Sequence, residues 1–161
     1  MHKIQDDESG ESAIFIKKVV TKNGKLEAEK ISVEEAKEKL DQKQKPLFHI
    51  HGFSNKPTQF LSDMQKEEKK INEFNLVPVC WPSLLLSANK DDHYKGSQGL
   101  SKNAGLAFQK LKDAIDVFTN KSIMCHSMGN RVLRYAAASN FKFDNIFMAA
   151  AVSKIICDSS I

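Results

Sequence analysis

The residues best suited to do chemistry are those at 125–129, in the order Cys-His-Ser-Met-Gly. They lie between a short apolar run and a helical pattern. A serine at a sharp turn from strand to helix can project its hydroxyl above a sheet, with the helix N-terminus behind it. That turn needs small residues on both sides; Gly129 fills one position, and Cys125 stands where glycine is usual. Ser127 is therefore the candidate nucleophile.

Two motifs upstream of Ser127 supply a context for it. The sequence HGFSN at 51–55 follows an apolar run and precedes a helical pattern, and WPS at 81–83 ends the next run. A loop between a strand and a helix can provide a backbone N–H that stabilises an oxyanion. We expect the three motifs to lie at the ends of neighbouring strands.

The elements that must position these motifs alternate between short apolar runs and longer helical patterns. Strands are expected at 13–20, 47–51, 76–81, 121–126 and 145–152, and helices at 32–42, 58–74, 104–118 and 129–140. Ser32 and Glu35 form a capping box at the first helix, and the aperiodic stretch 82–99 is expected to be a loop. The alternation predicts an α/β fold with a parallel sheet flanked by helices, formed by residues 13–161 as a single domain after a polar tail at 1–12.

Composition restricts the class of protein. The chain has 161 residues, 41% hydrophobic and 27% charged, which excludes collagen-like, disordered and disulfide-dense proteins. Its three cysteines form no CxxC pair and its N-terminus lacks a signal sequence, so a cytoplasmic location is expected. No apolar run is long enough to cross a bilayer. The net charge of +4 is scattered, and Lys66, Lys69 and Lys70 lie beside Glu67 and Glu68 as on a solvated helix face, so no nucleic-acid partner is expected.

In their order and spacing, HGFSN, WPS and HSMGN resemble the α/β-hydrolase superfamily, in particular its uncharacterised branch of esterase/lipase-like serine hydrolases, over about residues 31–152. The resemblance implies that Ser127 attacks the carbonyl carbon of a small ester or similar acyl substrate. It also implies that the backbone N–H groups of Met128 and Phe53 form the oxyanion hole and that no cofactor is needed.

The resemblance further implies an acid and then a histidine after the nucleophile, but only Asp144 and Asp158 follow Ser127, and no histidine does. The sequence thus resembles the N-terminal two-thirds of such a hydrolase, and activity is expected to be weak or absent. The alternative is a catalytically incomplete homologue that serves as a binding or regulatory module. Asp144 is expected at the wrong end of its strand, and Asp158 near the right end.

Histidines elsewhere in the chain offer alternatives. His126 is expected to point away from Ser127, because adjacent residues at a strand end face opposite sides, and His51 to brace the loop that follows it. His93, in the expected loop, is the one movable candidate for a base. His49 and His51 share one strand face, where Asp91, Asp92 or His93 could complete a zinc site; the role of His51 beside Gly52 favours the hydrolase interpretation, without metal.

The last expected strand, 145–152, is apolar enough to be buried on both faces of a sheet. Only nine residues follow it, so we expect its outer edge to lie open and to pair with another copy of the chain.

Overall fold

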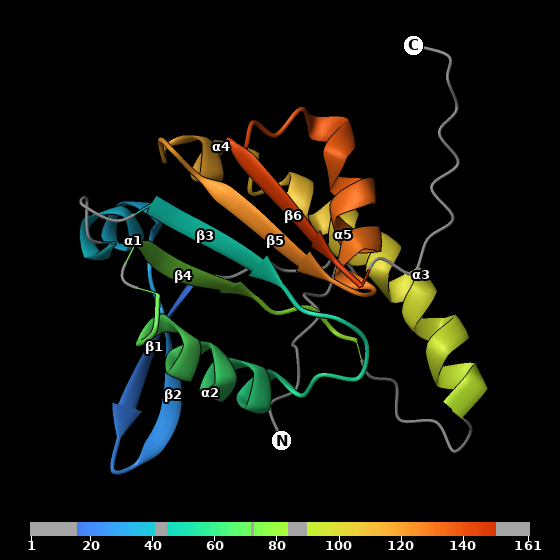
Figure 1. Cartoon of the computed structure of the whole chain (residues 1–161), viewed down its shortest axis with the longest axis horizontal. Helices are drawn as coiled ribbons and strands as arrows, with labels where there is room; N and C mark the ends of the chain where they lie inside the picture. The colour runs from blue at the N-terminus through green and yellow to red at the C-terminus, as the bar shows by residue number, and fades with distance from the viewer. Residues whose placement is uncertain (1–15, 41–44, 72, 84–89, 151–161) are drawn as a thin grey trace.

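The computed structural model describes residues 16–40, 45–71, 73–83 and 90–150 (Figure 1). It is an α/β fold, in which a four-stranded parallel sheet is flanked by helices on both faces. The predicted α/β class, with a parallel sheet flanked by helices, is therefore confirmed. The expected tail at 1–12, Asp158 and the end of the chain lie outside the described residues.

The sheet consists of β3 (Lys45–Ile50), β4 (Phe74–Val79), β5 (Ser122–His126) and β6 (Asn145–Ala149), in the order β4-β3-β5-β6. β4 is an edge strand, where its Pro78 is tolerated because an edge does not need every N–H. Pro46 in β3 precedes Leu47, the first residue that pairs with β5. Both prolines thus leave the ladder between β3 and β5 intact.

The strand order reverses between β3 and β5. From β3 the chain crosses to β4 on one side through α2 (Pro57–Glu68), and then returns to β5 on the other side through α3 (Lys90–Gln109) and α4 (Lys112–Asp116). Ligand sites in open parallel sheets lie at such a reversal, outside the carboxyl ends of the strands. The ends of β3 and β5 carry the HGFSN and HSMGN motifs, so the topology brings them to this position.

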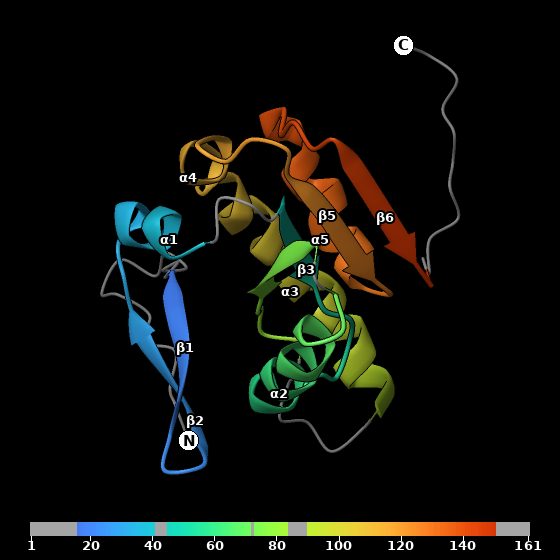
Figure 2. The same cartoon turned by 60° about the vertical axis from the view of Figure 1, so that its left-hand side comes forward.

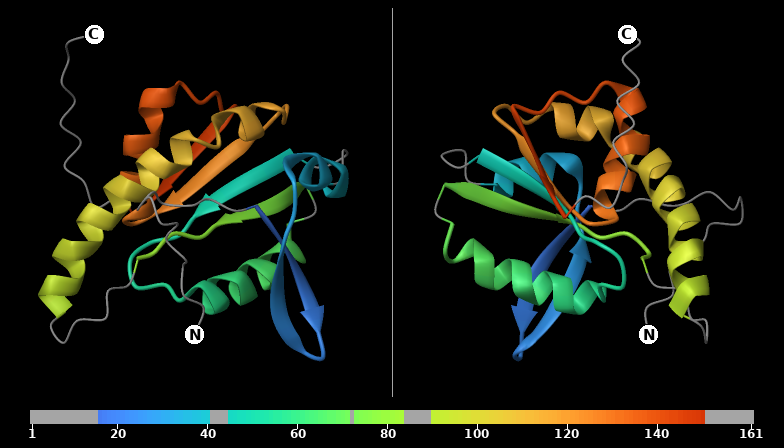
Figure 3. Two further views of the ribbon diagram at one scale, coloured as in Figure 1. Left: turned by 180° about the vertical axis from the view of Figure 1, so that it is seen from behind. Right: turned by 45° about the vertical axis from the view of Figure 1, so that its right-hand side comes forward.

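Helices on the two faces enclose the core. α2 covers one face, and α3, α4 and α5 (Gly129–Ala136, continued by the 3₁₀ turn η1, Ala137–Ser139) cover the other (Figure 3). The buried core lies mainly on the α3–α5 side and includes Phe48, Ile50, Phe108, Ile123, Cys125 and Val132. None of the helices within the described residues combines the length and the apolar character required to span a membrane.

The expectation of a loop at 82–99 was wrong for residues 90–99, which form the first half of the 20-residue helix α3. Small polar residues occupy buried positions of α3: Ser97 in this half and Ser101 just after it are fully buried. One turn further, a Cβ on Gly105 would lie 2.5 Å from Tyr135 Cβ and 2.6 Å from Val132 O of α5. α3 therefore packs through small residues that allow close approach, and hydrophobic periodicity does not detect such a face.

The N-terminal part forms a hairpin that the sequence interpretation missed. β1 (Lys17–Lys22) and β2 (Lys25–Lys30) pair antiparallel and stand beside the main sheet (Figure 2). Asn23 and Gly24 both have positive φ, at 51° and 73°, which is the backbone of a two-residue hairpin turn. The expected strand at 13–20 thus overlaps β1 but is shifted.

The cap of α1 (Val33–Lys39) is confirmed, because Ser32 Oγ accepts a hydrogen bond of 3.1 Å from the Glu35 N–H.

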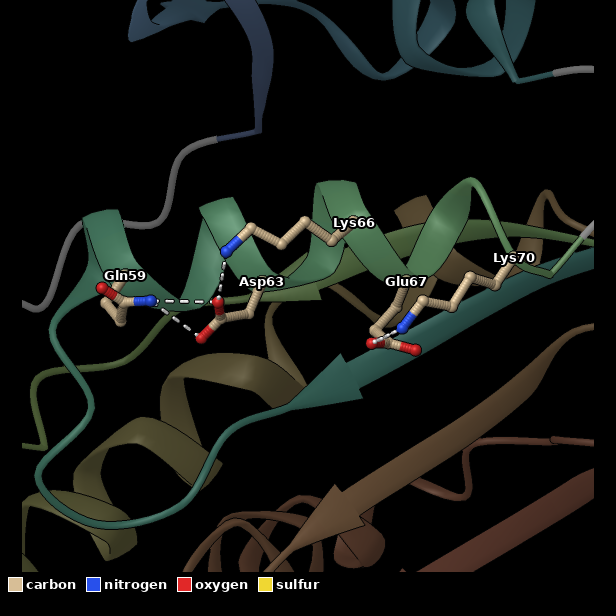
Figure 4. A network of polar contacts seen from close by, with 5 residues as sticks. All are labelled: Gln59, Asp63, Lys66, Glu67 and Lys70. Carbon is tan, nitrogen blue, oxygen red and sulfur yellow. Dashed lines mark hydrogen bonds and ion pairs between the residues drawn. The ribbon is translucent and has the colours of Figure 1, made fainter.

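The outer face of α2 is polar, as its lysine and acid pattern predicts. Figure 4 shows Gln59 donating to Asp63 and the ion pairs Lys66–Asp63 and Lys70–Glu67, at 3.5 and 2.8 Å. Such exposed pairs contribute at most about 1 kcal/mol each. The helix ends at Glu68, earlier than the expected 74, because Phe74 begins β4.

The expected burial of the last strand on both faces was wrong. β6 is exposed along its whole described length, with Ile146, Phe147 and Met148 at 54%, 47% and 53% of their full accessibility. α5 packs over β5 and β3 and leaves β6 uncovered. Among the described residues, no strand pairs with the outer edge of β6.

Candidate active site

Ser127 occupies a sharp turn between β5 and α5. Its φ is +49°, a value uncommon for a residue with a side chain and costing on the order of 1 kcal/mol or more. The turn is held by its surroundings: the Ser127 N–H donates to Ala149 O of β6 at 2.9 Å. The residue itself is half-buried, whereas Cys125, in place of the usual glycine, lies fully buried in the core. Burial also raises the pKa of the Cys125 thiol to about 12, so this thiol stays protonated.

Gly129 allows α5 to begin directly behind Ser127. A Cβ at this position would lie 2.6 Å from Ile50 O and 2.8 Å from His51 O, both backbone atoms at the end of β3. Ordinary contact distances are about 3.5 Å or more. Only glycine therefore lets the first turn of α5 approach β3 this closely.

The loop between β3 and α2 lies against the serine turn. A Cβ on Gly52 would be 2.8 Å from His126 Nδ1 and 3.0 Å from Ser127 Cβ. The structure thus brings together the two segments that the sequence interpretation assigned to one site. Met128 is buried and is the N-cap residue of α5, and Phe53 follows directly after Gly52.

The WPS motif holds the β3–α2 loop from the side of β4. The Trp81 N–H donates to His51 Nε2 at 3.2 Å, and Trp81 Nε1 donates to His51 O at 2.8 Å. Ser83 Oγ donates to Asn55 O at 3.3 Å, and Ser97 Oγ of α3 donates to Ser83 O at 3.0 Å. The loop that carries Phe53 is therefore tied down on both sides of that residue.

Phe53 also contacts α3. Its ring meets the Tyr94 ring edge to face, with centroids 5.5 Å apart. Because 90–99 is helical, Tyr94 is presented from a rigid element, which sequence reasoning had assigned to a loop. Aromatic pairs of this kind contribute about 0.5–1.5 kcal/mol.

His51 is fixed as a neutral structural residue, as the sequence interpretation expected of a bracing role. Its Nε2 accepts from Trp81, so Nδ1 carries the proton and donates to Gly52 O at 2.8 Å. Burial lowers the pKa of His51. With both nitrogens engaged and the ring stacked on Trp81, His51 has no free position for a substrate proton or a metal ion.

His49 lies on the same sheet face and packs under α2. Its Nδ1 is 2.9 Å from Met64 Sδ, and its ring lies edge to face with Phe60. Burial lowers the pKa of His49 to about 4. In the part of the chain that the structure describes, no three His, Cys, Asp or Glu side chains gather as metal ligands would. The His49–His51 pair therefore gives no support to the zinc alternative.

The other candidate acid–base residues lie on three different segments of the chain. The expectation that His126 points away from Ser127 was wrong: His126 is exposed, and its Nδ1 and Ser127 Cβ both lie beside Gly52, because the positive φ of Ser127 ends the alternation of the strand. No hydrogen bond between described residues joins His126 to Ser127. His93 lies on α3 beside Tyr94. Asp144 precedes β6, at the opposite end of the sheet from Ser127, as expected.

Asn130 is a residue of this site that sequence reasoning missed. It is buried, and its Nδ2 donates to Ser127 O at 2.8 Å and to Ala149 O at 3.2 Å. The sequence does contain a signal for it. Asn130 is a polar residue directly after the Ser-x-Gly segment, at the start of a helix whose next inward position is Val132.

No family model matches the chain, and no curated protein matches it either. The fold and the site geometry therefore carry the functional argument.

Proposed function

We propose that this protein is a serine hydrolase of the α/β-hydrolase type, with Ser127 as nucleophile and a small ester or similar acyl compound as substrate. The observation that carries the proposal is the strained backbone of Ser127, at the carboxyl end of β5 and in contact with the β3–α2 loop. Strain of this kind persists where the structure around it enforces it, and it gathers at functional sites.

In the proposed reaction, Ser127 Oγ forms a bond to the acyl carbon while the carbonyl electron pair moves onto oxygen. The N–H groups of Met128 and Phe53 bind the resulting oxyanion, a contribution of about 3–4 kcal/mol for each donor in comparable sites. The tetrahedral species then expels the alkoxide, leaving an acyl group on Ser127. Water attacks this acyl group and releases the carboxylic acid.

The protonation state of Ser127 limits the rate. Between described residues, no imidazole is hydrogen-bonded to its hydroxyl, and the nearby His51 is already engaged at both nitrogens. The hydroxyl proton therefore passes to solvent, and the reaction relies on the oxyanion hole and on substrate binding. Turnover of activated esters is expected to fall far below the roughly 10 per second of an average enzyme.

The experiment that tests the proposal is labelling with a fluorophosphonate probe. The wild-type chain should be labelled faster than Ser127→Ala, while Ser62→Ala in α2, a matched control, should be labelled like the wild type. Equal labelling of the wild type and Ser127→Ala would reject the assignment.

A second candidate function, a binding module, is favoured by the exposed apolar strand β6. An uncovered strand edge can pair with a strand of another chain, and we propose a second copy of this protein as that partner. Light scattering during size-exclusion chromatography should then give a mass that rises with concentration. A constant monomer mass would exclude this self-association.

A further inference from the structure

We propose that Asn130 is a positioning residue, which orients the peptide between Ser127 and Met128 so that the Met128 N–H faces the oxyanion. This inference rests on the proposed function, because it concerns the same oxyanion hole. Asn130 itself touches no reacting atom; it acts through the peptide that it holds.

The contacts of Asn130 converge on one carbonyl. Ser127 O accepts from Asn130 Nδ2 at 2.8 Å and from the Asn130 backbone N–H at 3.1 Å. The same Nδ2 reaches Ala149 O of β6 at 3.2 Å, and that oxygen also accepts the Ser127 N–H at 2.9 Å. One buried amide group thus ties the serine turn to both α5 and β6.

Because the peptide bond is planar, holding Ser127 O in place also fixes the direction of the Met128 N–H. In a planar trans peptide the C=O and the N–H point in opposite directions. Asn130 draws Ser127 O into the protein, so the N–H of Met128, in the same peptide plane, points away from that interior contact. Met128 is the N-cap residue of α5, so its N–H has no partner carbonyl inside the helix, and no other described residue accepts from it.

The chemistry at Asn130 requires an amide. Two carbonyl oxygens face one end of its side chain, so that end must be the NH₂ group. Asn130 Oδ1 is buried without a hydrogen-bond partner among the described residues. Burying an unpaired oxygen is unfavourable, and such exceptions call for an explanation beyond stability. The donor end explains it: an aspartate would set negative charge against two carbonyls, and an alanine would leave each carbonyl with its backbone N–H donor alone.

The test compares Asn130→Ala and Asn130→Asp with a matched control, Asn145→Ala. Asn145 is also in contact with the sheet through its amide, donating to Ser122 Oγ at 3.2 Å, but it lies at the opposite end of β6. The measured quantity is the second-order rate constant of fluorophosphonate labelling, in which the Oγ–P bond forms, the P–F bond breaks, fluoride leaves and the serine proton goes to solvent. Both Asn130 variants should react about 100-fold or more slowly than the wild type, and Asn145→Ala within twofold of it.

A pH profile separates positioning from a general loss of structure. In Asn130→Asp, a protonated carboxyl can again donate to Ser127 O, so its rate relative to the wild type should rise as the pH falls from 8 to 5. The same ratio for Asn130→Ala should stay flat. If a folded Asn130→Ala reacts within threefold of the wild type, the proposal is overturned; if that variant fails to fold, a flat profile for Asn130→Asp overturns it instead.

A second readout keeps this inference distinct from the proposed function. If the wild type and Ser127→Ala are labelled equally, the hydrolase proposal fails, and the amide NMR signal of Met128 then tests the orientation alone. That signal should shift and its hydrogen exchange change in Asn130→Ala but not in Asn145→Ala. An unchanged Met128 amide would show that Asn130 does not orient this peptide.

Discussion

Replacing Gly129 by alanine tests the close approach of α5 to β3. The added Cβ would lie 2.6 Å from Ile50 O and 2.8 Å from His51 O, whereas favourable contacts begin at about 3.5 Å. Both oxygens belong to the backbone at the end of β3, a central strand, and cannot rotate away as a side chain could. The start of α5, together with Ser127 and Met128, must therefore move by about 1 Å.

Two measurable losses follow from this displacement. Overpacking of this kind costs about 1–3 kcal/mol, so the melting temperature should fall by about 2–12 °C. Misplacing reacting groups by about 1 Å can reduce a rate about 100-fold, and fluorophosphonate labelling should slow accordingly. Differential scanning calorimetry and the labelling rate constant measure the two effects on one preparation.

Gly99→Ala in α3 is the matched control. A Cβ there meets nothing within 4 Å, so the substitution gains about 1 kcal/mol of helix propensity and should raise the melting temperature by about 2–4 °C without changing labelling. A Gly129→Ala protein that melts and reacts like the wild type would show that α5 does not begin against the end of β3.

Three further predictions concern packing, pH and association. Gly105→Ala, whose Cβ would meet Val132 O at 2.6 Å, should lower the free energy of unfolding by about 1–3 kcal/mol in urea titrations; an unchanged midpoint would contradict the α3–α5 contact. Burial lowers the pKa of His49 from 6.5 to about 4, so between these values the unfolded chain binds a proton that the folded protein does not. The free energy of unfolding therefore has its full value above about pH 6.5, and about 3 kcal/mol of it is lost as the pH falls toward 4. Unfolding of His49→Gln should depend less on pH over this range than unfolding of the wild type; equal slopes in the two proteins would refute it. Met148→Lys, at an exposed position of β6, should reduce concentration-dependent association in light scattering with little loss of stability, and undiminished association would exclude β6 as the interface.

Local chemistry made part of the fold predictable. Ser32 and Glu35 predicted the start of α1, and the apolar runs around Ile50 and Ile123 predicted β3 and β5. Each of these signals depends on a few neighbouring residues. The turn at Asn23 and Gly24 was equally local, and the Asn-Gly pair would have predicted the hairpin had it been used.

The first half of α3 could not be found by hydrophobic periodicity. Ser97 is fully buried there and donates to Ser83 O, and just beyond it the fully buried Ser101 donates to Gln98 O of the preceding turn. The helix is held by close packing against α5 and by the hydrogen bond from Ser97 to Ser83, which both depend on segments outside it. The predicted burial of β6 was wrong for a related reason. The apolar composition of a strand does not show which of its faces the neighbouring helices cover.

The sequence predicted which motifs form the candidate site, but not the contacts between them. Ser127 and Gly52 were placed at strand ends from sequence, but their contact depends on the strand order, which places β5 next to β3. Asn130 and the clamp from Trp81 to His51 are three-dimensional hydrogen bonds without a pattern of their own. The left-handed backbone of Ser127 likewise follows from the packing of α5 against β3.

The most direct test of the proposed active site is a crystal structure of the protein after reaction with a fluorophosphonate. We expect a single phosphonyl group on Ser127 Oγ, with its non-bridging oxygen about 2.7–3.1 Å from the backbone nitrogens of Met128 and Phe53. A phosphonyl group on another residue, or one on Ser127 whose oxygen points away from both N–H groups, would contradict the proposed nucleophile and oxyanion hole.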